Sequence, residues 1–189
     1  AASFKPTPVR HDRGENAMSA KRITRLALFV AAAFVLAIIE NSLPPVLAFA
    51  PGAKMGISNV VSLVALIISG VTDACFVLVA RCLMSAIASG NYFALAYSLA
   101  GGFVSLAIEA VLVKTAIKRL SIVSISFIGA LAHNVTQLAV ASISVHANLF
   151  AALPLTLLAS VIAGLFVGAA TFFTIKYLPE RLYDEPLAP

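Results

Sequence analysis

The sequence predicts an all-α integral membrane protein, a bundle of six transmembrane helices. Its 189 residues are 61% hydrophobic and 11% charged, whereas soluble domains are about half apolar and about a quarter charged. The apolar residues fall in runs separated by short polar, proline or glycine breaks. At roughly 20 residues per span, the chain has room for about six helices. We therefore expect a single membrane domain over residues 18–181.

The two ends of the chain differ from this apolar body. Residues 1–17 are polar and lack the apolar core of a signal peptide. Met18 looks like a natural start, so residues 1–17 are expected to be a cloning remnant or a disordered extension. Residues 182–189 are expected to form a polar cytoplasmic tail.

The breaks in hydropathy locate the six spans. We expect them over about residues 23–39, 55–69, 74–88, 92–117, 122–145 and 150–177. Pro44 and Pro45 stop any continuation of the first span, and Gly70 ends the second, which is short. Thr72 or Asp73 can cap the third span, and capping is the preferred interpretation of Asp73, because its carboxylate can accept a hydrogen bond from a free backbone N–H.

Small residues predict close helix contacts in the first and last spans. Ser160, Gly164 and Gly168 form a ladder at four-residue spacing in the last span. The first span has two pairs with the same spacing, Ala27/Ala31 and Ala33/Ala37. Each alanine pair is expected to contact either a helix of the same chain or a helix of a partner subunit.

The basic residues indicate the orientation of the bundle. One side of a six-span protein would hold Lys21, Arg22, Arg25, Lys114, Lys118, Arg119, Lys176 and Arg181, and the other side only Lys54. The positive-inside rule then predicts that both termini are cytoplasmic. Because these residues mark helix ends rather than one surface, no nucleic-acid partner is expected.

Polar side chains occur at similar depth in five of the expected spans. They are Glu40, Lys54, Asn59, Arg81, Ser98, His133, Asn134 and Gln137. Unsatisfied polar groups are costly in hydrocarbon, so these must face one another, water or a ligand. Two interpretations stay open: a buried network that locks the helices together, with pairs such as Glu40–Lys54 and Arg81–Gln137, or a ligand pocket that opens outward.

The charges in this set bear on the ligand. Lys54, Arg81 and His133 outnumber Glu40, which favours an anionic or acceptor-rich ligand. Lys54 alone has a second explanation, because lysines near helix ends often extend to the membrane surface. Glu109 is expected to lie deeper toward the cytoplasm, apart from the others.

The sequence lacks the motifs of several enzyme classes. It contains no P-loop, no nucleophile elbow, no HExxH and no aspartate-rich pair that would hold magnesium on a prenyl diphosphate. Cys75 and Cys82 lie about 10 Å apart along a helix, too far to bridge each other, and no metal-ligand spacing is present. We therefore expect neither an enzyme nor a metal or cofactor site.

Several stretches resemble one known family. They are Glu40 before Pro44-Pro45, the segment Pro51-Gly52-Ala53-Lys54-x-Gly56-x-x-Asn59, Arg81, the run Ser98-Leu99-Ala100-Gly101-Gly102, and Ala132-His133-Asn134-x-x-Gln137. Over about residues 22–178 the chain resembles the Gx transporter family, which also carries the label heptaprenyl diphosphate synthase component I. That family is similar to the substrate-binding S-components of energy-coupling factor transporters, which are six-helix membrane proteins.

The resemblance implies a subunit of a prokaryotic plasma membrane that binds a small vitamin or cofactor precursor. Its partners would be a transmembrane coupling subunit, contacted by the alanine pairs of the first span, and cytoplasmic ATPases. Members also look associated with flavin- and quinone-linked electron transfer, so the alternative is an accessory membrane subunit of such a system or of isoprenoid-quinone metabolism. A third possibility, an enzyme component acting on prenyl diphosphates, lacks the motifs that this chemistry needs.

Overall fold

A computed structural model describes residues 20–42 and 56–179 of the chain. The regular elements of this part are all helical: α1 (Ala20–Ser42), α2 (Asn59–Ser69), α3 (Val71–Ser89), α4 (Tyr92–Ala116), α5 (Ile122–Ser144), the 3-10 turn η1 (Leu149–Ala152) and α6 (Leu153–Tyr177). The expectation of an all-α fold is confirmed for these residues. The expectations for residues 1–17, for Lys54 and for residues 182–189 lie outside the described part of the chain.

Five of the helices are long and apolar enough to cross a membrane, and α2 is the exception. Its 11 residues extend about 16 Å at 1.5 Å per residue, roughly half of a 30 Å hydrocarbon layer. The second expected span is therefore a short apolar helix rather than a full crossing. Polar residues and glycines bound the other helices close to the expected positions, because hydropathy breaks and turn residues are local signals.

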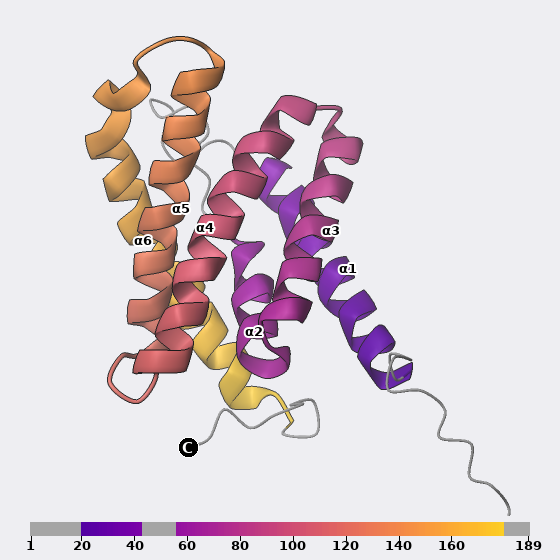
Figure 1. Cartoon of the computed structure of the whole chain (residues 1–189). Helices are drawn as coiled ribbons and strands as arrows, with labels where there is room; N and C mark the ends of the chain where they lie inside the picture. Colours follow the sequence, from indigo (N-terminus) through magenta and orange to yellow (C-terminus); the bar gives the residue numbers. More distant parts are fainter. Residues whose placement is uncertain (1–19, 43–55, 180–189) are drawn as a thin grey trace, which may run out of the picture.

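The short helix α2 lies inside the bundle. Every residue from Val60 to Ile68 is buried, and α2 contacts α1, α3, α4 and α6. A helix that is apolar all round needs such surroundings. In Figure 1, α2 occupies the lower half of the bundle, and the long helices extend well above its beginning.

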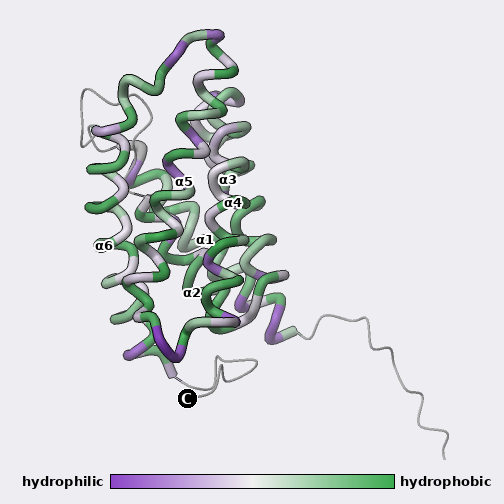
Figure 2. The backbone as a smooth tube through the Cα atoms, turned by 60° about the vertical axis from the view of Figure 1, so that its left-hand side comes forward, coloured by the Kyte–Doolittle hydropathy of each residue, from purple (hydrophilic) through white to green (hydrophobic). Residues whose placement is uncertain are grey.

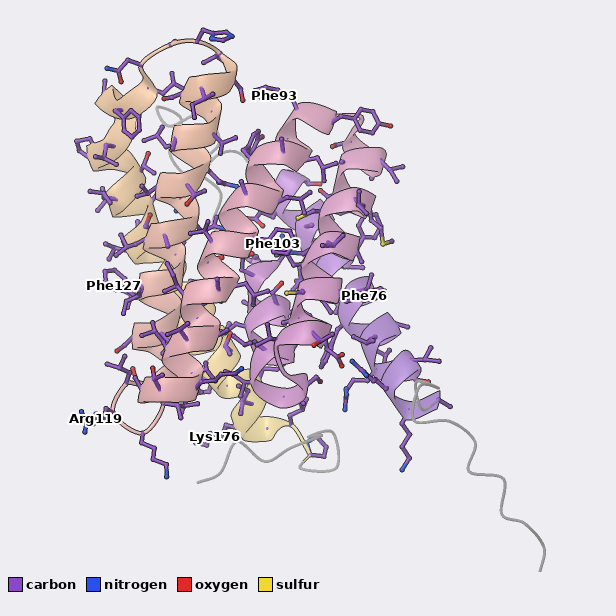
Figure 3. The ribbon with its side chains drawn as sticks, viewed as in Figure 1. Phe76, Phe93, Phe103, Arg119, Phe127 and Lys176 are labelled. Carbon is purple, nitrogen blue, oxygen red and sulfur yellow. The ribbon has the colours of Figure 1, made fainter. Side chains whose placement is uncertain are left out.

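The long helices α3, α4, α5 and α6 follow one another as antiparallel neighbours, and α1 lies against α3 (Figure 1). The described chain therefore begins and ends at the same end of the bundle. Arg119 and Lys176 lie at this end in Figure 3. Figure 2 shows hydrophobic segments along the lengths of the helices, with the hydrophilic turns that precede and follow α5 at opposite ends.

Apolar side chains cover the outer surface of the bundle. Phe76 is 56% exposed and Phe103 is 43% exposed, and both are labelled in Figure 3. A soluble protein rarely exposes so many large apolar side chains. This surface fits contact with lipid, in agreement with the expected membrane protein.

Glycines allow α6 to approach α5 closely. A Cβ atom on Gly164 would lie 2.6 Å from Cα of Phe127, and one on Gly168 would lie 2.6 Å from Cα of Val123. Backbone atoms cannot move aside as a flexible side chain can. The predicted small-residue ladder of α6 is thus a helix contact within the chain, and Ser160 of the same ladder is fully buried.

Asp73 links α3 to α1 instead of capping α3, so the expected cap is wrong. The helix begins after Gly70 without a side-chain cap. The Asp73 carboxylate, 1% exposed, accepts hydrogen bonds from Nε and Nη2 of Arg22 and lies 3.5 Å from Nη2 of Arg25. Two cations on the neighbouring helix attract the carboxylate more strongly than the orphan backbone N–H groups do.

Replacing Asp73 with Asn is expected to destabilise the fold by roughly 2–3 kcal/mol, because the buried guanidinium of Arg25 loses its counter-charge. The partial exposure of Arg22 reduces the cost. Thermal unfolding of the purified protein in detergent measures the effect. Arg119→Gln, which removes an exposed charge at the same end of the bundle, should leave the melting temperature unchanged. Equal melting temperatures for Asp73→Asn and the parent protein would contradict the assigned role.

Candidate functional site

A cavity of about 420 Å³ lies inside the bundle, above the beginning of α2. Its wall includes residues from all six α-helices, among them Ala37 of α1 and Val167 of α6. Because α2 fills only one half of the interior, none of the described helices occupies the centre of the other half. The volume is within the range of small-molecule pockets.

The cavity reaches one end of the bundle. Ser89 and Asn91, in the turn between α3 and α4, belong to its wall and are exposed. Phe93, just beyond this turn, lies at the end opposite to Arg119 and Lys176 in Figure 3. The mouth therefore faces away from the basic end.

The structure brings together the predicted site residues that it describes. Glu40, Asn59, Arg81, Ser98, His133, Asn134 and Gln137 all line the cavity. Lys54, the remaining predicted residue, is outside the described part of the chain. The side chains thus share one space, and their role in binding a ligand stays a prediction.

Arg81 anchors the beginning of α2. Its guanidinium donates from Nη1 to Oγ of Ser58 at 2.7 Å and from Nη2 to Oδ1 of Asn59 at 2.6 Å. The predicted contact with Gln137 is not among the hydrogen bonds of the described residues. Arg81 is 8% exposed, and its Nε is buried and has no partner in the described chain.

Glu40 connects the end of α1 to the residues just before α2. Its Oε1 accepts a hydrogen bond from the backbone N–H of Gly56. Gly56 has a φ of +68°, a left-handed conformation that a residue without Cβ adopts at little cost. This acceptor is therefore already engaged by the backbone.

The polar side chains of α5 have two roles: one joins α5 to α6, and another has an unpartnered nitrogen. Asn134 donates from Nδ2 to Oγ of Ser160 on α6 at 2.9 Å, so it connects two helices. Nδ1 of His133 has no partner among the described residues. Both side chains are buried and both line the cavity.

Gly101 of α4 allows the polar face of α5 to pack closely against α4. A Cβ atom at position 101 would lie 2.8 Å from Cγ of Gln137 and 2.9 Å from the backbone oxygen of His133. The close approach of the two helices therefore depends on the absence of a side chain at Gly101.

Glu109 lines the same cavity, contrary to the expectation that it lies apart. Its carboxylate lies against Gly129 of α5, where a Cβ atom would collide with it. The sequence did contain a signal: Ser98, Ser105 and Glu109 are spaced by seven and four residues, which places them on one helix face. Other wall residues that sequence reasoning missed are Ser58, Ser85, Asn91, Tyr97, Ser105 and Ser126.

Metal binding receives no support from the described residues, which contain no cluster of three or more histidine, cysteine, aspartate or glutamate side chains. Cys75 and Cys82 form no disulfide bond in the described part of the chain. The cavity is thus equipped with a guanidinium, amides, hydroxyls, an imidazole and carboxylates, which suit hydrogen bonding to an organic molecule.

Comparison with known proteins identifies a family for this chain. The model of the family described as Heptaprenyl diphosphate synthase component I matches residues 29–174. No curated protein and no solved structure matches the chain. The matched range contains every described residue that lines the cavity.

Replacing Gly101 with Ala is expected to lower the stability by about 1–3 kcal/mol, because the added methyl group forces α4 away from the backbone of α5. Thermal unfolding in detergent provides the measurement. Ala107→Val adds methyl groups on the exposed face of the same helix and should have little effect. If both variants melt at the temperature of the parent protein, the close approach at Gly101 is not a constraint.

Proposed function

This chain belongs to the family described as heptaprenyl diphosphate synthase component I, and on that premise we propose that it is the membrane-embedded, substrate-binding subunit of an uptake transporter. In this proposal it acts like the S-component of an energy-coupling factor transporter. Its substrate is a small, acceptor-rich or anionic vitamin or cofactor precursor.

The observation that carries this proposal is the cavity with free hydrogen-bonding groups inside an apolar bundle. Nε of Arg81, Nδ1 of His133 and Oγ of Ser126 are buried, and the described residues give them no partner. Unsatisfied polar atoms in such surroundings are costly. A bound molecule would supply the missing partners, and the cationic Arg81 favours one with acceptor groups.

The orientation of the cavity supports capture from outside. Its mouth is at the end of the bundle opposite to Arg119 and Lys176 (Figure 3). By the positive-inside rule the basic end faces the cytoplasm, so both termini are cytoplasmic and the mouth faces outward. The chain has no P-loop of its own, so active uptake would rely on ATPase subunits.

The family description names a component of a prenyl diphosphate synthase. Chemistry on prenyl diphosphates uses magnesium held by clustered acidic residues. The acidic side chains of the cavity wall are Glu40 and Glu109, on different helices, and the sequence has no aspartate-rich motif. These observations favour binding over catalysis.

The alanine pairs of α1 differ in exposure, which favours one of them for contact with a coupling subunit. Ala33 and Ala37 are buried within the chain. Ala27 and Ala31 are exposed. We assign the partner contact to Ala27 and Ala31, where small side chains allow another helix to approach closely.

We expect a small molecule to copurify with the protein, and replacing Arg81 with Ala is expected to remove it, because the variant loses the cationic donor of the cavity. Native mass spectrometry of the protein released from detergent measures its occupancy. Arg81→Lys keeps a positive charge and replaces Arg81→Ala in the test if Arg81→Ala does not fold. It should bind the small molecule more weakly than the parent protein does. Arg119→Ala is the control. Undiminished occupancy in both Arg81 variants would exclude Arg81 from the site.

The double substitution Ala27→Leu and Ala31→Leu is expected to reduce copurified coupling and ATPase subunits about ten-fold, because the bulky side chains block a close helix contact. Affinity purification from the native membrane, followed by mass spectrometry, measures the loss. Ala32→Leu, also exposed on α1, is the matched control. Copurification of flavoproteins in place of ATPases would favour the electron-transfer alternative.

A further inference from the structure

The cavity wall carries opposite charges that do not neutralise each other by contact. Arg81 on α3 and Glu109 on α4 both line it, and each is 8% exposed. The ion pairs of the described residues join Asp73 to Arg22 and to Arg25, so Arg81 and Glu109 are not within ion-pair distance of each other. Buried charges of this kind are costly unless a partner bridges them.

Glu109 has free acceptor capacity toward the cavity. Within the described residues, no hydrogen bond or ion pair reaches its carboxylate. Of the neighbouring wall hydroxyls, Ser105 donates to the backbone oxygen of Gly102 at 3.0 Å, and Ser126 has no partner in the described chain. A carboxylate accepts hydrogen bonds, so a donor group placed against it would satisfy this acceptor.

The cavity wall around Glu109 is one pole of the site, and the wall around Arg81 is the other. The pole around Arg81 offers hydrogen-bond donors. The Nε of Arg81 is unused by the described residues, and its Nη atoms are held in place by Ser58 and Asn59. The amide of Gln137, buried in the same wall, has no described hydrogen-bond partner. This pole fits an acceptor, above all a carboxylate or another planar anion.

We propose that the cavity binds a dipolar small molecule, with an acidic or acceptor-rich end at Arg81 and a protonated amine or N–H donor end at Glu109. This inference rests on the proposed function, because it specifies the ligand class of the same site. It also narrows the predicted ligand class, which was anionic or acceptor-rich. The charge of Arg81 is balanced by Glu109 as well as by Glu40. A purely anionic ligand would leave Glu109 without a partner and would be repelled by its negative charge.

Gly129 determines where the carboxylate of Glu109 lies. A Cβ atom at position 129 would collide with the carboxyl oxygen and lie 2.7 Å from both Cγ and Cδ of Glu109. Gly129→Ala therefore displaces the carboxylate and keeps its charge, whereas Glu109→Gln keeps the shape and removes the charge. The two variants separate the position of the acceptor from its charge.

The test uses the full-length protein in detergent and probes of graded length. The dipolar probes are ω-amino acids from β-alanine to aminocaproate, compared with alkanoates and alkylamines of equal chain length. Ligand-induced shifts in melting temperature give the apparent Kd of each. For at least one chain length, the ω-amino acid should bind the parent protein at least about ten-fold more tightly than the alkanoate and the alkylamine of the same length. The length series is needed because the probe must span both poles.

Glu109→Gln should abolish this ten-fold preference and leave alkanoate binding unchanged or stronger, and Gly129→Ala should weaken the preference. The probe-free melting temperature of each variant verifies that it folds. Equal binding of alkanoates and amino acids to the parent protein would overturn the dipolar class, as would absence of amino-acid binding at every length. A preference that persists in Glu109→Gln would overturn the role of Glu109. None of these failures would change the result of native mass spectrometry on the Arg81 variants, and that experiment tests the proposed function independently.

Discussion

The hydrogen bonds from Arg81 to Ser58 and Asn59 are the interaction on which the interior of this protein depends. A helix that begins inside an apolar bundle carries polar side chains, here those of Ser58 and Asn59, that need hydrogen-bond partners. Arg81 fixes this beginning from the neighbouring helix α3. Because α2 begins there, half-way along the bundle, no described helix fills the space beyond its beginning, and the cavity lies there (Figure 1).

The polar side chains of the interior serve both of the purposes that the sequence left open. Some lock helices together, as Asn134 does with Ser160 and Glu40 does with the backbone of Gly56. Others line the cavity, such as Glu109 and also His133, whose Nδ1 has no partner among the described residues. A network that served only to join helices would satisfy its members. The mixture is what a binding site with a rigid wall requires, because the locking residues hold the free ones in position.

The two halves of the bundle differ in construction. At the basic end the core is filled by the buried residues of α2, and Asp73 ties α1 to α3. At the opposite end the cavity opens beside the turn between α3 and α4. A space open at one end and filled at the other is suited to holding a molecule rather than to conducting it. Release toward the basic end would therefore need a rearrangement of the bundle or of its position in the membrane.

The sequence by itself determined the membrane class, the helix boundaries and the shared depth of most cavity residues, because hydropathy runs, turn residues and position along a helix are all local properties. The tertiary structure decided the partner of Asp73, the membership of Glu109 in the cavity wall and the exposure of Ala27 as opposed to Ala33. Each of these depends on the rotation of a helix about its axis and on its neighbours. Those are set by side-chain packing between segments far apart in the chain, which no single stretch of sequence contains.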